Sequence, residues 1–307
     1  MAGSVSATER NGRGRAGRWR RRLAGLLPLL LAGCAPAFGA GGEPQAARSR
    51  PTIVSLNPCA DAILAEVADP AQVLAISHYS ADPRSASMPQ EQARRYRTTR
   101  GTVEEVLALH PDLVIDGSFA APAAAPAYRR LGLRVETVGT VANVDEAREQ
   151  VRRLAALSGH PRRGEALLAR IDAALAAAAP PARAAPIRAV MWESGGMVPG
   201  DRTLIADLLR RTGFANASAA AGYAQADLLP LERLMADPPQ VIFASAAGEG
   251  QGKDADRMLA HPALARLGGV YRATFSPDLL YCGGPTLIRA AERLRAVRLA
   301  FVAGRPG

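Results

Sequence analysis

The fold is decided by the stretch Arg162-Arg-Gly-Glu-Ala-Leu-Leu-Ala-Arg-Ile-Asp-Ala-Ala-Leu-Ala-Ala-Ala-Ala179. Alanine and leucine are strong helix formers, so this composition predicts one long helix that ends at Pro180-Pro181. An earlier helix is expected to begin at Asn143-Val-Asp-Glu146, a capping-box pattern, and to run to Leu157. We expect residues 161–181 to form a connecting helix between two other folded parts.

Short apolar runs of strand length lie on both sides of this helix and alternate with segments of helical periodicity. Such an alternation is typical of parallel sheets that are covered on both faces. The expected fold class is therefore α/β, with two Rossmann-like lobes whose central parallel sheets are joined by the long helix. The runs are Thr52–Leu56, Val73–Ile76, Leu113–Ile115, Val135–Val138, Ile187–Trp192, Val241–Ala244 and Ala273–Phe275. The helical segments include Cys59–Val67, Thr102–Leu109, Leu204–Arg211 and Leu231–Met235.

The two halves of the chain repeat each other weakly. Glutamate, alanine and proline coincide between Glu104-Glu-Val-Leu-Ala-Leu-His-Pro-Asp-Leu-Val-Ile115 and Glu232-Arg-Leu-Met-Ala-Asp-Pro-Pro-Gln-Val-Ile-Phe243. Each copy predicts a helix, a turn marked by proline and a buried strand. We expect an N-terminal α/β lobe over residues 51–160 and a C-terminal α/β lobe over residues 182–307.

The chain of 307 residues carries a formal charge of +10, but the excess is concentrated at its start. Residues 1–33 hold seven arginines and one acid, which leaves only +4 for the remainder and indicates no nucleic-acid partner. The basic run is followed by the apolar segment Leu23–Ala32, which is too short to span a bilayer as a helix. This order is typical of an export signal, so residues 1–33 are expected to be a signal peptide.

The signal ends in Leu31-Ala-Gly-Cys34, which resembles the lipobox of bacterial lipoproteins. The resemblance implies that Cys34 is acylated and holds the protein at a membrane, with residues 34–50 as a tether. Cleavage nearer Ala37 or Ala40 is an alternative, as is an N-terminus without any signal.

The motifs together resemble the helical-backbone class of periplasmic substrate-binding proteins of ABC importers, which serves cobalamin, ferric siderophores and haem. The resemblance covers about residues 51–303 and includes Ile53-Val-Ser-Leu-Asn-Pro58, both repeats, the long helix and Gly200-Asp-Arg-Thr-Leu-Ile-Ala-Asp-Leu-Leu209. It implies a monomeric periplasmic receptor, without a cofactor of its own, that takes a metal chelate from solution and delivers it to a membrane permease. The ligand cleft would lie between the lobes, which agrees with the general position of ligands beyond the carboxyl ends of parallel strands.

Two other classes remain open. The first is a secreted two-lobed α/β enzyme that acts in the same cleft, although the sequence has no G-x-S-x-G motif and its run Gly248–Lys253 is an incomplete phosphate-binding loop. The second is a lipoprotein that senses a ligand without a permease.

Glu104 and Glu232 match the family's pattern of one glutamate on each lobe that docks to arginines of the permease. Charges at two separate points would fix the orientation of a transient complex. The alternative is that each acid only complements the dipole of its helix. Because Thr102-x-x-Glu105 reads as a capping box, Glu105 is assigned to the helix and Glu104 stays available.

Aromatic and arginine side chains near the expected cleft are the candidate ligand contacts. A metal chelate offers flat apolar faces to aromatic rings and acidic edges to arginine. The alternative is that half of these side chains pack beneath the loops as core. The candidates are Asn57, Tyr79, Tyr96, Arg100, Phe119, Trp192, Arg202, Tyr223 and Tyr281.

Cys59 and Cys282 each lie in a loop after an expected strand, one in each lobe. They could form a disulfide in an oxidising compartment, or be two buried thiols. Direct metal binding is not expected, because three of the four histidines precede proline in connector positions and only His78 lies in a cleft loop.

Overall fold

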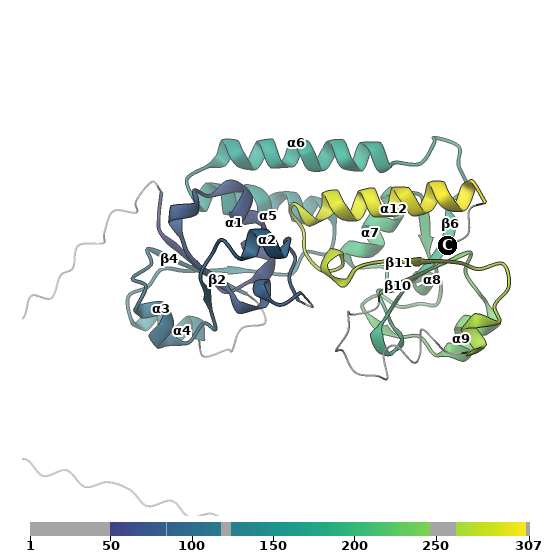
Figure 1. Ribbon diagram of the computed structural model, residues 1–307, viewed down its shortest axis with the longest axis horizontal. Coiled ribbons are helices and arrows are strands. Elements are labelled where there is room, and N and C mark those ends of the chain that lie inside the picture. The colour runs from purple at the N-terminus through teal and green to yellow at the C-terminus, as the bar shows by residue number, and fades with distance from the viewer. Residues whose placement is uncertain (1–49, 84, 118–123, 246–261, 305–307) are drawn as a thin grey trace, which may run out of the picture. The chain divides into compact units, whose positions relative to one another are not determined.

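The computed structural model describes residues 50–83, 85–117, 124–245 and 262–304 (Figure 1). The expected signal peptide, the lipidation site Cys34 and most of the expected tether lie outside these residues. None of the described helices is both long and apolar enough to cross a lipid bilayer.

The first lobe is built on a parallel sheet of five strands in the order β3-β2-β1-β4-β5. Its central strand carries Ile53 and Val54, which are fully buried because helices cover both faces of the sheet. The strands are β1 (Ile53–Ser55), β2 (Val73–Ser77), β3 (Thr98–Thr99), β4 (Leu113–Gly117) and β5 (Val135–Val138). The helices are α1 (Pro58–Val67), η1 (Pro70–Gln72), η2 (His78–Ala81), α2 (Gln90–Ala93), α3 (Val103–Leu107), α4 (Ala124–Arg130) and α5 (Val144–Leu157).

The second lobe repeats this plan with a parallel sheet in the order β11-β10-β6-β8 and a small antiparallel pair, β7 and β9. The expected α/β fold class with parallel sheets in two lobes is therefore confirmed. The strands are β6 (Ile187–Glu193), β7 (Met197–Val198), β8 (Phe214–Asn216), β9 (Asp227–Leu228), β10 (Val241–Ser245) and β11 (Tyr271–Thr274). The helices are η3 (Ser194–Gly196), α7 (Leu204–Arg211), α8 (Ala217–Ala220), α9 (Leu231–Ala236), α11 (Pro262–Ala265), η4 (Pro277–Leu279) and α12 (Thr286–Val302).

Helix α6 (Pro161–Ala178) packs against α1 and α5 of the first lobe and against α12 of the second (Figure 1). Its buried side chains, which include Leu168, Ile171 and Leu175, belong to one apolar cluster that continues through both lobes. The helix starts with proline after His160, where the missing amide hydrogen is not needed. Because α6 contributes to a core that both lobes share, it couples the two lobes.

Close packing of α5 on α6 depends on Gly164. A methyl group at Gly164 would lie 2.5 Å from the Cβ atom of Ala155, far inside van der Waals contact. Gly164→Ala is therefore expected to lower the free energy of unfolding by about 1–3 kcal/mol, although alanine normally stabilises a helix relative to glycine. Denaturant unfolding measures the change, with Gly139→Ala, where the added methyl meets no atom, as the control. A stabilised Gly164→Ala variant would contradict this packing.

The structure also corrects several expected elements. Strand β11 begins two residues before the expected run Ala273–Phe275, and Phe275 lies after its end. Strands β3 and β8 were not expected, because two or three residues give no readable periodicity. Helix α12, which packs on α6, was not singled out either.

Candidate functional site

The carboxyl ends of the parallel strands bring together the loops that follow β1, β2, β6 and β11. In each sheet the chain continues on both sides of its first strand, β1 or β6, which creates the topological switch point where such sheets bind ligands. Loops from both lobes therefore carry candidate contacts at equivalent edges. These contacts are Asn57, Tyr79, Glu193 and Tyr281.

A disulfide bond between Cys59 and Cys282 joins these two edges. Cys59 lies in the first turn of α1, directly after β1, and Cys282 lies between β11 and α12; their Cα atoms are 5.0 Å apart. Around the bond, the Ser87 hydroxyl lies 2.7 Å from the Cys282 sulfur, and the Ser87 carbonyl accepts hydrogen bonds from Thr286 and Arg289 at 3.0 Å. A covalent bond thus connects the two lobes in the region where they contact each other, which we call the seam.

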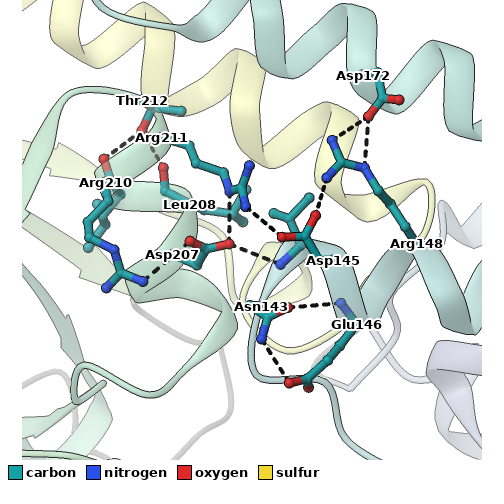
Figure 2. Close-up of polar contacts among 12 residues, drawn as sticks. Asn143, Asp145, Glu146, Arg148, Asp172, Asp207, Leu208, Arg210, Arg211 and Thr212 are labelled. Carbon is teal, nitrogen blue, oxygen red and sulfur yellow. Dashed lines mark hydrogen bonds and ion pairs between the residues drawn. The ribbon is translucent and has the colours of Figure 1, made fainter.

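Asp207 of α7 forms a second connection across the seam (Figure 2). Its Oδ2 atom accepts the backbone amide of Val144, the first residue of α5, at 3.0 Å and the Nε–H of Arg211 at 2.9 Å. Burial alone would raise the pKa of Asp207, but the two hydrogen bonds and the guanidinium charge hold the pKa below its usual value. A carboxylate of the second lobe therefore accepts a hydrogen bond from a backbone amide at the N-terminus of α5, which has no partner within its own helix.

The same network reaches α6 through α5 (Figure 2). Asp145 pairs with Arg211 of α7 at 3.2 Å and also with Arg148. Arg148 in turn donates two hydrogen bonds to Asp172 of α6, at 3.0 and 2.6 Å, which raises the pKa of this guanidinium further. Ion pairs between acidic and basic side chains thereby connect α5, α6 and α7.

Two predicted contacts lie at the edge of the first sheet. Asn57 caps α1, because its side-chain oxygen accepts the amides of Cys59 at 2.8 Å and Ala60 at 3.2 Å. Tyr79 follows β2 in η2, is 51% exposed and lies against the His78 ring with the centroids 4.1 Å apart. Asn57 thus has a structural role, whereas the Tyr79 ring is available to a ligand.

The remaining first-lobe candidates differ in position. Arg100 directly follows β3 and is exposed. Tyr96 precedes β3 and packs against the main core, and its pKa is raised by burial and by the charge of Glu66. The expectation that Tyr96 faces the cleft is therefore wrong, because the unforeseen strand β3 places it before a strand. Phe119 lies outside the described residues.

In the second lobe, the expectation that Trp192 contacts the ligand is wrong. Its side chain is fully buried in the outer apolar cluster of that lobe, because the alternation of β6 turns Trp192 and Val190 to the same face. Tyr223 borders this cluster and donates a hydrogen bond to the Leu228 carbonyl at 3.2 Å. Arg202 is exposed at the loop before α7.

Tyr281 is 61% exposed, and its hydroxyl donates a hydrogen bond to Glu193, the last residue of β6. Glu193 is buried, which raises its pKa, and burial together with the neighbouring carboxylate raises the pKa of Tyr281 strongly. Sequence reasoning missed Glu193, since nothing local marks it. The signal that could have found Glu193 is its position at the carboxyl end of a central strand.

The two candidate docking glutamates occupy equivalent positions. Glu104 is the second residue of α3 and Glu232 the second residue of α9, and both are exposed. Both helices cover the sheet face opposite to α6 (Figure 1). Glu105 completes no capping box: it accepts the Thr99 hydroxyl at 2.6 Å and the Arg100 amide at 2.8 Å, and these bonds lower its pKa.

A family model described as a periplasmic binding protein matches residues 53–270, which is more than half of the chain. The chain belongs to this family. Its members are binding proteins of the periplasm. A comparison with curated proteins gave no match.

Solved structures of periplasmic binding proteins share this fold. The periplasmic heme-binding protein RhuT from Roseiflexus sp. RS-1 has a TM-score of 0.68 and 26% identity, covering 83% of this chain and 98% of RhuT. The vitamin B12-binding protein BtuF of Vibrio cholerae has a TM-score of 0.62 and 21% identity, covering 82% and 98%. A periplasmic heme-binding protein from Pseudomonas aeruginosa has a TM-score of 0.62 and 24% identity, covering 80% and 92%.

Within its described residues, this periplasmic binding protein shows no group of three or more potential ligands placed to hold a metal ion. His160 is buried, with its Nε2 atom 2.7 Å from the side-chain oxygen of Gln72, and His110 adopts a positive φ of 48° in a connector.

A groove of about 570 Å³ lies between β11 and α12. Its lining includes Tyr271 and Arg293, and none of the predicted ligand contacts belongs to it.

Proposed function

We propose that this periplasmic binding protein captures a metal chelate between its lobes and delivers it to the permease of an ABC importer, held to a membrane through Cys34. The chelates considered are haem, cobalamin and ferric siderophores, with haem as the first candidate because RhuT is a heme-binding protein. The observation that carries the proposal is the covalent junction of two sheet edges, each followed by an exposed tyrosine.

The exposed side chains suit such a ligand. Tyr79 of the first lobe and Tyr281 of the second offer aromatic faces to a flat chelate. Arg100 and Arg202 supply positive charge for carboxylates at its edge. A ligand in contact with both lobes stabilises the arrangement that a permease would recognise.

A binding screen tests the proposal. Haemin, cyanocobalamin and a ferric hydroxamate siderophore are each titrated into the protein, and one is expected to saturate at one molecule per chain. At a hundredfold excess over its Kd, that chelate adds about 2.7 kcal/mol to stability. It is recovered unchanged, which separates a receptor from an enzyme. Failure of all three chelates to bind would contradict the proposed function.

The exposed tyrosines provide the matched variants. Tyr79→Ala and Tyr281→Ala are each expected to weaken binding roughly tenfold, since loss of an aromatic contact costs about 1–1.5 kcal/mol. Leu131→Ala is the control, because Leu131 is similarly exposed at 52% but follows α4. Equal affinities in all three variants would exclude the two tyrosines as contacts.

Delivery depends, in this proposal, on the glutamate pair. The double variant Glu104→Arg/Glu232→Arg is expected to reduce uptake in cells more than tenfold, because reversed charges repel a basic docking surface. Ligand affinity is expected to stay unchanged, since both side chains are exposed on α3 and α9 and neither is among the candidate ligand contacts. Glu91→Arg/Glu292→Arg makes the same charge change at two other exposed acids. Unaltered uptake in the first variant would favour a sensor without a permease.

A further inference from the structure

Asp61 is a carboxyl group buried completely beneath the loop that carries Tyr79. It lies in the first turn of α1, two residues after the disulfide-bonded Cys59. Its Oδ2 atom accepts the Ser77 amide at 2.9 Å and the Ser80 hydroxyl at 2.6 Å. These two residues bracket His78 and Tyr79, so one carboxyl group holds both ends of the exposed turn.

The surroundings of Asp61 contain hydroxyl and amide groups. Burial raises its pKa to about 7, against the opposing effect of the nearby Ser55 and Ser80 hydroxyls and the Ser77 amide. Ser80 is itself fully buried, and its carbonyl accepts a hydrogen bond from Gln90 of α2 at 3.2 Å. The turn is therefore anchored from beneath by α1 and at its far side by α2.

The bonds of Asp61 go to the ends of the turn and not to its rings. His78 and Tyr79 pack ring against ring, while the Oδ2 atom of Asp61 bonds to the Ser77 amide and the Ser80 hydroxyl. Asp61 therefore acts on Tyr79 through the backbone of the turn.

We propose that Asp61 is a positioning residue that holds Tyr79 in its ligand-binding conformation through the hydrogen bonds that its Oδ2 atom accepts from Ser77 and Ser80. The inference rests on the proposed function, in which Tyr79 contacts the chelate. Asp61→Ala removes the acceptor that both ends of the turn share, so this variant is expected to bind the ligand roughly fivefold more weakly.

Amide hydrogen exchange of the ligand-free protein tests the anchor without any ligand. At pH 8, protection of residues 77–82 is expected to be lower in Asp61→Ala than in the wild type. Asp61→Asn keeps a side-chain oxygen as acceptor and is expected to retain part of the protection. Ser80→Ala removes one of the two bonds and is also expected to lie between the wild type and Asp61→Ala. Equal protection of residues 77–82 in the wild type and Asp61→Ala would overturn the role of Asp61.

Haemin affinity, measured on the same proteins, tests the link to function. Affinity is expected to follow the protection of residues 77–82, highest in the wild type and lowest in Asp61→Ala. In a Tyr79→Ala background, Asp61→Ala is expected to cause no further loss, because its effect runs through Tyr79. If exchange follows the prediction while haemin binds equally well to all these proteins, Asp61 anchors a turn that does not contact the ligand. That result would overturn the positioning role through Tyr79 and, separately, the assignment of Tyr79 as a contact. Ser80→Ala keeps the test independent of whether Asp61→Ala folds.

Discussion

Replacing Cys59 and Cys282 together with serine is expected to lower the free energy of unfolding by about 3–5 kcal/mol. The bond joins residues 223 positions apart, so its loss releases a very large loop in the unfolded chain. The entropy of such a loop alone corresponds to about 5 kcal/mol, an upper bound for this effect. Chemical denaturation of the oxidised wild type and of the double variant measures the difference.

Reduction of the wild type provides the control for this experiment. Treatment with reductant is expected to bring the wild type to the stability of the serine variant and to leave that variant unchanged. Alkylation followed by intact mass measurement reports the state of Cys59 and Cys282 directly. Two free thiols at these positions in oxidised, folded protein would contradict the bond.

Asp207→Ala is expected to cost about 2–4 kcal/mol, because it leaves the buried amide of Val144 and the guanidinium of Arg211 without their shared acceptor. The lowered pKa of Asp207 means that its stabilising contribution is complete above the unfolded value near 3.9. The contribution is lost as pH falls through the lower folded pKa. Unfolding measured from pH 7 down to pH 3 is expected to show a difference between variant and wild type that shrinks in acid.

Asp237→Ala is the matched control for Asp207→Ala. Asp237 also pairs with an arginine, Arg188 at 2.6 Å, but its side chain is 75% exposed. An exposed pair contributes about 0–1 kcal/mol, so this variant is expected to change stability little. Similar losses in the two variants would show that the connection through Asp207 is no stronger than an ordinary surface pair.

Much of the fold could be predicted from local pattern. The composition of 162–179 indicated the connecting helix, and Asn143 does begin α5 by accepting the Glu146 amide at 2.8 Å. The Glu146 carboxylate instead accepts the Ala142 amide at 2.7 Å, so the capping box is modified. Such strongly periodic segments could be predicted because their secondary structure depends mainly on residues that are close in the sequence.

The candidate site was less predictable, because its geometry depends on contacts between distant residues. Trp192 was assigned to the ligand by its residue type, although the alternation of β6 buries it. Tyr96 was misplaced because the two-residue strand β3 leaves no pattern. The bond from Ser80 to Asp61 and the bond from Tyr281 to Glu193 span 19 and 88 positions, and only the topology brings these pairs together.

Two connections cross the seam, the disulfide between Cys59 and Cys282 and the network around Asp207. Together with α6 they are expected to hold the two sheet edges at a nearly fixed spacing. Ligand recognition would then depend on the loops after the strands more than on a large movement of the lobes. The account therefore requires that a single ligand molecule touch both lobes at once.

Hydrogen exchange with and without ligand tests this requirement most directly. The protein is saturated with haemin, or with cyanocobalamin if that is the chelate that binds, and exchange is followed by mass spectrometry. We expect simultaneous protection of residues 77–82 in the first lobe and 276–285 in the second, at one ligand per chain. Protection confined to one lobe, or to the groove between β11 and α12, would contradict a ligand site between the lobes.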